Sequence, residues 1–242
     1  MKSKMRPHIQ PRNFACLILF ICTAGYSYAQ EQYRNVEFKA FNLRPGNFSD
    51  ILFYDANGQK TNLEFKKKSR TDLQQSLVNI ENGLLGFYIP IRNAEGETQT
   101  HPVARVWMNP EWKSPLLIFL DTSIGKLRKY SVIAIEDSVQ NFEIGTIKIV
   151  NLTGTEIVGS IDGNIIKLAN ATASESYILP NNERIEVAIA TQTVSRNHLL
   201  YKNTLGLNRN TRSLLIFRPP KRSGSVKIQG QLLIEYDPDS EE

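Results

Sequence analysis

The sequence has little of the chemistry that enzymes and metal-binding proteins commonly use. Its only two cysteines, Cys16 and Cys22, lie near the N-terminus, and only two of its three histidines, His101 and His198, follow them. It also lacks a G-x-S-x-G elbow, an H-E-x-x-H pair, a P-loop and a G-x-G-x-x-G stretch after an apolar run. We interpret both histidines as surface imidazoles. The sequence therefore predicts no catalytic residue, no metal site and no cofactor, and we expect a protein that is not an enzyme.

The N-terminus has the regions of a secretory signal peptide. Four basic residues precede an apolar run at 14–24, and the small residues Ser27 and Ala29 form a cleavage site. The apolar run is too short for a transmembrane helix, which needs about 20 residues. We expect residues 1–29 to be removed with both cysteines, so the mature chain has no disulfide. The mature chain is then exported, to the periplasm or outside the cell, without an integral membrane segment.

The excess of positive charge belongs to the same N-terminal segment. The formal net charge is +5, and removing four basic residues leaves 25 Lys and Arg against 24 Asp and Glu. A nearly neutral mature chain has no electrostatic reason to bind nucleic acid. The only dense basic run, 66–68 followed by Arg70, is typical of a solvated loop or a guarded sheet edge. Binding to an anionic surface is the alternative interpretation of that run.

The mature chain contains an internal repeat. Three pairs of segments match in the same order: 38–43 with 147–152, 116–119 with 214–217, and 135–137 with 234–237. The first pair is offset by 109 positions and the second by 98. A period near one hundred residues indicates two related domains. We predict domains at 30–140 and 141–237, joined between about 137 and 145, and an acidic tail at 238–242.

Short apolar bursts separated by turn-forming residues indicate β-strands throughout. Apolar and polar residues alternate over 36–40, and Asn-Gly at 57–58 favours a hairpin. Residues 70–79 have helical spacing as well as alternation, and we favour a strand there. Strands are expected at 36–43, 51–54, 84–91, 101–108, 115–121, 127–136, 146–152, 156–161, 176–179, 185–190, 198–202, 213–217 and 226–236. The pattern predicts an all-β protein of two tandem antiparallel β-sandwiches of the immunoglobulin-like type.

Two tryptophans are the sharpest indication of a binding site. Trp107 and Trp112 flank Asn109-Pro110, and a large aromatic side chain near a turn can act as a platform on which a sugar stacks. The alternative for Trp107 is a core or inter-domain role, because it lies on the opposite face of its strand from Val106.

The acidic residues are scattered. Glu136-Asp137 is the nearest pair, and the repeat has Glu235 and Asp237 at the corresponding strand end. A glycosidase needs two carboxylates held face to face. Because both pairs end the last strand of a repeat, we interpret them as solvating a strand end or protecting a sheet edge.

The export signal, the two tandem β-domains, the Asn-Leu end of the first strand in each repeat and the stretch Arg212–Pro219 together resemble uncharacterised secreted proteins of Gram-negative bacteria. The resemblance spans most of the mature chain and implies an exported two-domain β protein, but it assigns no chemistry to any residue. Periplasmic pilus chaperones share the length and the two-domain layout.

These observations lead to one main hypothesis and two alternatives. The main hypothesis is an exported, non-enzymatic structural or interaction protein of the cell envelope, with another envelope protein as its partner. The first alternative is a carbohydrate-binding module that uses Trp107 and Trp112 to bind a glycan. The second is a chaperone-like protein that donates a strand to the sheet of a client.

Overall fold

The computed structural model describes residues 32–43, 48–124, 127–181, 184–192, 197–222 and 224–237. The predicted signal peptide with its cleavage site, and the predicted acidic tail, lie outside the described residues. All of the strands belong to one compact unit, Tyr33–Glu242. The described part of the chain folds into strands and loops without a helix, which confirms the all-β class.

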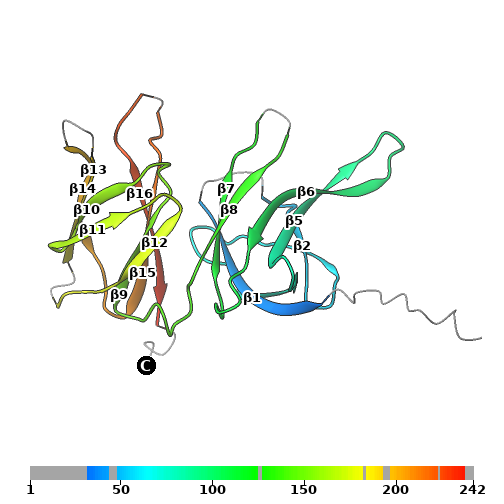
Figure 1. The fold of residues 1–242 in the computed structure, drawn as a ribbon, viewed down its shortest axis with the longest axis horizontal. Helices are drawn as coiled ribbons and strands as arrows, with labels where there is room; N and C mark the ends of the chain where they lie inside the picture. The colour runs from blue at the N-terminus through cyan, green and yellow to red at the C-terminus, as the bar shows by residue number, and fades with distance from the viewer. Residues whose placement is uncertain are drawn as a thin grey trace, which may run out of the picture. The chain divides into compact units, whose positions relative to one another are not determined.

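The first repeat forms a sandwich of two sheets (Figure 1, blue to green). Its strands are β1 (Tyr33–Asn42), β2 (Leu52–Tyr54), β3 (Lys60–Asn62), β4 (Gln74–Asn79), β5 (Leu84–Arg92), β6 (Thr98–Trp107), β7 (Leu116–Asp121) and β8 (Tyr130–Ile135). The sheet orders are β4-β1-β7-β8 and β3-β2-β5-β6. The segment 70–79 has both helical spacing and strand-like alternation. It contributes strand β4, so the strand that we favoured is confirmed.

The second repeat forms a sandwich with the same connectivity. Its strands are β9 (Thr146–Asn151), β10 (Ile157–Ile161), β11 (Asn164–Leu168), β12 (Thr172–Ile178), β13 (Arg184–Gln192), β14 (Asn197–Gly206), β15 (Thr211–Arg218) and β16 (Gln229–Tyr236). The sheet orders, β12-β9-β15-β16 and β11-β10-β13-β14, repeat those of the first sandwich with every strand advanced by eight. The two tandem β-sandwiches are therefore confirmed.

The sheets are mostly antiparallel, as predicted, but the central strands of each sandwich form a parallel pair that was not expected. Strand β1 pairs with β7 in parallel, and β9 pairs with β15 in the same way. Lys39 lies opposite Leu116, and Lys148 lies opposite Leu214, so the pairing preserves both sequence offsets, 109 and 98. The segments matched in the sequence are thus the paired central strands. Their near-continuous apolar runs reflect burial on both faces, which is typical of parallel strands.

Each sandwich has its own core between its two sheets. In the first, the alternating residues Val36, Phe38 and Ala40 of β1 are buried, and Phe38 packs edge-on against Phe53 with ring centroids 5.4 Å apart. The second core is mainly aliphatic, with Phe217 as its buried aromatic residue, and includes Ile147, Ile149 and Leu215 together with residues of β10, β13 and β14. The two cores explain why apolar and polar residues alternate along the strands of each repeat, because every second side chain of a strand must face inward.

The predicted hairpin at 57–58 joins β2 to β3. Asp55 Oδ1 accepts hydrogen bonds from the backbone N–H groups of Asn57 and Gln59, both at 2.8 Å. Gly58 has a φ of 73°, a conformation that favours glycine. Strands β3 and β11 were not predicted, since they are short or follow a tight turn directly.

A third apolar cluster joins the two sandwiches. It contains five pairs of equivalent positions, one residue from each repeat: Phe41 and Val150, Leu43 and Leu152, Leu116 and Leu214, Ile118 and Ile216, Ile135 and Leu233. Each of these ten side chains is at most 4% exposed. The sheets β4-β1-β7-β8 and β12-β9-β15-β16 therefore pack through equivalent faces, like the self-complementary interface of a twofold dimer.

Candidate functional site between the two sandwiches

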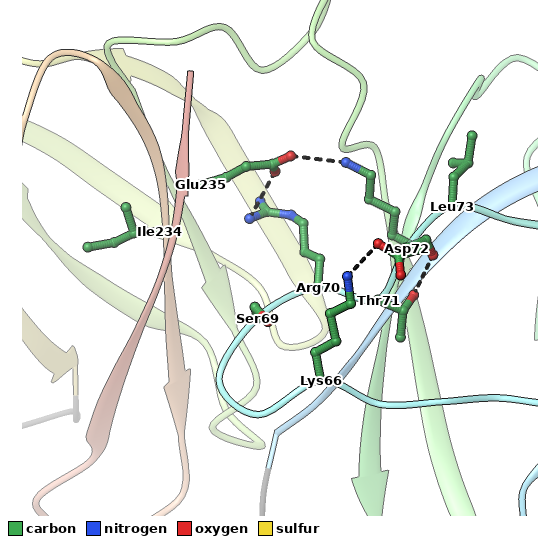
Figure 2. Close-up of a pocket in the computed structure, with 9 residues that line it drawn as sticks. Lys66, Ser69, Arg70, Thr71, Asp72, Leu73, Ile234 and Glu235 are labelled. Carbon is green, nitrogen blue, oxygen red and sulfur yellow. Dashed lines mark hydrogen bonds and ion pairs between the residues drawn. The ribbon is translucent and has the colours of Figure 1, made fainter. Parts of the chain in front are cut away.

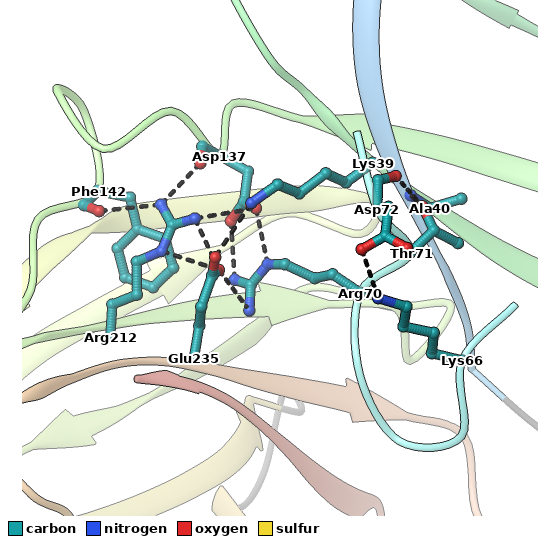
Figure 3. Close-up of polar contacts among 10 residues, drawn as sticks. All are labelled: Lys39, Ala40, Lys66, Arg70, Thr71, Asp72, Asp137, Phe142, Arg212 and Glu235. Atoms are coloured by element: carbon teal, nitrogen blue, oxygen red, sulfur yellow. Dashed lines mark hydrogen bonds and ion pairs between the residues drawn. The ribbon is translucent and has the colours of Figure 1, made fainter. Parts of the chain in front are cut away.

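A buried ion pair ties the loop before β4 to the end of β8. Arg70 donates from Nε to Asp137 Oδ2 at 2.7 Å and from Nη2 to Oδ1 at 2.8 Å (Figure 3). The Arg70 side chain is 5% exposed and that of Asp137 is fully buried. A planar guanidinium matches the two carboxylate oxygens, which makes this geometry strong and directional. Arg70 was predicted in a solvated basic run, and the fold instead carries it inward.

Arg212 on β15 supplies a second guanidinium to the same place. Its Nη1 donates to the backbone oxygens of Asp137 at 2.7 Å and Phe142 at 3.2 Å, and its Nε and Nη2 donate to Glu235 at 3.0 and 2.7 Å. The guanidinium also lies 5.3 Å from the centroid of the Phe142 ring. Figure 3 shows both guanidiniums directed at the two carboxylates. Arg212 therefore holds the turn after β8 against β15 and β16.

Glu235 on β16 completes the charged cluster, which we define as Lys39, Arg70, Asp137, Arg212 and Glu235. Lys39 Nζ lies 3.0 Å from Glu235 Oε1. Burial raises the pKa of the Glu235 carboxyl, but Arg70, Arg212 and Lys39 outweigh it and leave the pKa below its ordinary value. A carboxylate held in this way stays ionised and has no proton to donate near neutral pH.

The charged cluster corrects the interpretation of the acidic pairs. Asp137 was expected to solvate a strand end, yet it is 1% exposed and lies between two guanidiniums. The strand register also changes which residues are equivalent. Leu116 lies opposite Ile135 and Leu214 opposite Leu233, so Asp137 corresponds to Glu235 and not to Asp237. The sequence match was out of register by one residue at Ile135 and Glu136 and by two at Asp137, and a one-residue slip places a side chain on the other face of a strand.

A pocket of about 280 Å³ opens beside the charged cluster (Figure 2). Its lining residues are Lys39, Lys66, Ser69, Arg70, Thr71, Asp72, Leu73, Ile234 and Glu235. Lys66 pairs with Asp72 at its exposed rim, and Lys39 and Arg70 pair with Glu235. We call this the Lys39 pocket. Its charged side chains are paired with one another, and the pairs with Glu235 connect the two sandwiches. We call this region between the sandwiches the junction, and its arrangement is structural.

A second pocket of about 370 Å³ lies between β8, β9 and β12. Its lining residues are Trp112, Ala134, Ile135, Glu136, Lys148, Ala171, Thr172, Ala173 and Ser174. We call it the Trp112 pocket. Like the Lys39 pocket, it combines residues of both repeats, and sequence reasoning missed it because its members are up to 62 positions apart.

The two pockets occupy equivalent places in the repeat. Lys148 corresponds to Lys39, as the register of the parallel strands shows. Thr71 Oγ1 accepts the backbone N–H of Ala40 at 2.9 Å, and Ser174 Oγ accepts that of Ile149, the residue equivalent to Ala40, at the same distance. Thr71 and Ser174 are therefore equivalent. It follows that Ala173 stands in the Trp112 pocket where Arg70 stands in the Lys39 pocket.

The predicted binding residues Trp107 and Trp112 are placed differently. Trp107 ends β6 and is 54% exposed, so the alternative of a core or inter-domain role is wrong for it. Its indole covers Gly83, where an added Cβ would come within 2.8 Å of Nε1. Trp112 is half-buried and lines the pocket between the sandwiches, and Trp107 is not among the lining residues. The two side chains do not form one platform.

Lys148 is a lysine with unusually little contact with water. It is 7% exposed, and its Nζ lies 3.4 Å from the backbone oxygens of Glu136 and of Asn141 and 4.9 Å from the centroid of the Phe142 ring. Burial lowers the pKa of Lys148, and the charges of Asp137 and Glu136 oppose this only in part. The fold therefore holds an ammonium group at some cost beside the Trp112 pocket.

The two histidines lie away from these pockets. His101 on β6 is half-buried, and His198 on β14 is exposed, as expected, at a separate hollow with Leu200 and Ile228. Among the described residues, no group of three His, Cys, Asp or Glu side chains is arranged to hold a metal ion. Within the same residues there is no helix with the length and hydrophobicity needed to cross a membrane.

Comparison with known proteins does not place the chain in a family. No protein-family model matches it, and no curated protein is significantly similar to it.

Proposed function

We propose that this chain is an exported interaction protein of the cell envelope that acts by binding and not by catalysis. The observation that carries the proposal is that two acidic residues of the junction, Asp137 and Glu235, are committed to structural ion pairs. Asp137 and Glu235 share two guanidiniums, and Glu235 also pairs with Lys39. Removal of either partner from such a buried pair would leave the other charge uncompensated, so these carboxylates tie the two sandwiches into one scaffold. Such a scaffold suits recognition through its surface.

The surface of the first sandwich offers a place for a protein partner. Trp107 lies directly opposite Leu84 on the neighbouring strand, and both side chains are exposed. Ile80, in the turn that leads into β5, is exposed as well. Neighbouring exposed apolar side chains, with tryptophan among them, are typical of protein interaction sites. We propose that another envelope protein binds here.

Site-specific crosslinking tests the proposal. A photoreactive residue replaces Trp107 in the full chain, expressed in the organism that exports it, and Lys202 on β14 provides the exposed control position. We expect one specific crosslinked envelope protein from position 107 and none from position 202. Equal labelling from both positions would refute the interaction surface. Turnover of a glycoside, ester or peptide by the purified protein, lost on Glu136→Ala or Glu235→Ala, would refute the non-enzymatic assignment.

One observation favours a second function, carbohydrate binding. Trp112 lines a pocket in company with a lysine and a glutamate. Aromatic surface beside convergent polar groups is the usual composition of a small-ligand site.

A further inference from the structure

The Trp112 pocket has two polar groups whose hydrogen-bonding capacity is not used. Glu136 Oε1 accepts the backbone N–H of Ser138 at 3.0 Å, but Oε2 is buried and has no hydrogen-bond partner in the described part of the chain. Lys148 Nζ has three N–H donors, and within the described residues it makes two long hydrogen bonds, both of 3.4 Å to backbone oxygens, besides its contact with the Phe142 ring at 4.9 Å. A buried acceptor without a hydrogen-bond partner destabilises the fold. It indicates that a bound molecule supplies the missing donor.

The two hydroxyl groups of the pocket, those of Thr172 and Ser174, are already engaged. Thr172 Oγ1 donates to the backbone oxygen of Ala169 at 2.7 Å, and Ser174 Oγ donates to that of Glu175 at 2.6 Å while it accepts from Ile149. Recognition of a ligand therefore falls to Lys148 and Glu136. The remaining lining residues are apolar or aromatic: Trp112, Ala134, Ile135, Ala171 and Ala173.

The equivalent Lys39 pocket provides an internal comparison. There, Arg70 occupies the space next to the lysine and neutralises the carboxylates. In the Trp112 pocket the corresponding residue is Ala173, whose small side chain leaves that space open. Lys39 has an ion pair at 3.0 Å, whereas the contact of Lys148 with the backbone oxygen of Glu136 is 3.4 Å long. The same fold thus fills part of one pocket, of about 280 Å³, with an arginine, and leaves a larger one, of about 370 Å³, beside an aromatic side chain.

We propose that the Trp112 pocket is a binding site for one ring of an uncharged saccharide. A pair of neighbouring hydroxyls would donate to Glu136 Oε2 and accept from Lys148 Nζ, and the C–H face of the ring would lie on the Trp112 indole. One carboxylate and one ammonium side by side favour an uncharged ligand, because each charge would oppose a ligand of its own sign. The volume of about 370 Å³ is at the lower end of the range of roughly 300–1,000 Å³ for small-molecule sites.

This inference rests on the proposed function in one respect only, that the chain binds and does not turn its ligand over. The site needs both sandwiches, since Trp112 and Glu136 come from the first repeat and Lys148 and Ser174 from the second. The test therefore uses the whole mature chain, residues 30–242. Failure of saccharide binding leaves the crosslinking result at Trp107 unaffected, so the two proposals are judged separately.

Intrinsic fluorescence offers a direct readout, because the chain has only two tryptophans. Trp107 does not line the pocket, so Trp107→Phe leaves Trp112, which does, as the sole tryptophan reporter. An array of uncharged and acidic mono- and oligosaccharides identifies binding glycans, and titration of the best of them into Trp107→Phe should shift or quench the emission of Trp112. We expect uncharged glycans to bind and acidic ones to bind at least about tenfold more weakly, which is about 1.4 kcal/mol.

Three variants locate the ligand. Trp112→Ala and Glu136→Gln should each weaken binding by about tenfold or more in isothermal titration. Ala173→Arg, which copies the equivalent pocket, should abolish it. Trp107→Ala is the matched control and should bind within about twofold of the wild type, and thermal melts establish that each variant is folded. A folded wild type that binds no glycan of the array, or binding that Trp112→Ala and Glu136→Gln leave unchanged, would overturn the proposal.

Discussion

Replacement of Asp137 by asparagine should destabilise the protein strongly. The substitution keeps the shape of the side chain and removes its charge, so Arg70 and Arg212 are left with Glu235 as their nearest carboxylate. Both guanidiniums are buried, with side chains 5% and 2% exposed. Breaking a buried ion pair by removing one partner costs about 3–5 kcal/mol, because the remaining charge is left uncompensated.

The expected change in melting temperature follows from the size of the protein. For a domain of about 150–250 residues, 1 kcal/mol changes Tm by about 2–4 °C, so Asp137→Asn should lower Tm by about 10 °C. Differential scanning calorimetry or circular dichroism measures this directly. The structure also supplies a matched control, Asp72→Asn, which makes the same chemical change in the exposed pair with Lys66. That pair should contribute less than about 1 kcal/mol.

A double substitution separates the pair from its surroundings. If the cost of Asp137→Asn arises from stranded guanidiniums, then Arg70→Met in the same chain should restore part of the lost stability. Additive losses in the double variant would show that Asp137 stabilises the fold independently of Arg70. A loss of stability for Asp137→Asn no larger than that for Asp72→Asn would refute the reasoning, because the charged cluster would then not hold the sandwiches together.

Four further predictions concern pH, the pocket lysine, the two halves and processing. The folded-state pKa of Glu235 lies below its ordinary value of 4.5, so its contribution to the free energy of unfolding is present above pH 4.5 and is lost as the pH falls further. Glu235→Gln should therefore flatten the acid limb of the plot of Tm against pH, and an unchanged limb would contradict this. Lys148→Met should leave Tm unchanged or raise it, since burial disfavours the ammonium, and a clear fall in Tm would show that its contacts outweigh desolvation. The separate segments 30–140 and 141–242 should each fold around their own core and associate through the shared apolar face, which size-exclusion chromatography detects; unfolded halves would mean a single core. Intact mass should show a mature chain that begins after Ala29, and retained cysteine would exclude this cleavage.

The behaviour of Lys148 connects stability with the proposed binding site. The interior of the protein disfavours this lysine, and the same pocket holds a buried carboxylate oxygen that has no hydrogen-bond partner among the described residues, so polar groups and burial conflict locally. Such conflicts are found where a protein gives up stability for function. If Lys148→Met both preserves Tm and weakens saccharide binding, the residue is retained for recognition and not for folding.

Much of the fold could be predicted from the sequence because it depends on local patterns. The alternation over 36–40 specified which side of β1 enters the core, and Asn-Gly at 57–58 marked the hairpin that Asp55 and Gly58 close. The order of the repeat and its offsets of 109 and 98 held in the strand register as well, whereas the third match, at 135–137, did not. These features involve neighbours in sequence or a comparison of the chain with itself, so no knowledge of packing was needed.

The sequence by itself determined the all-β class, the tandem repeat and the central strands, because periodicity and turn chemistry are local. Only the tertiary structure decided what the charged residues do. Arg70 meets Asp137 across 67 positions, and Lys39 meets Glu235 across 196. Those contacts, and the pocket that Trp112 shares with Lys148, depend on how the equivalent faces of two sandwiches pack. A one-residue difference in register moves a carboxylate between solvent and a buried guanidinium, and no local pattern specifies that difference.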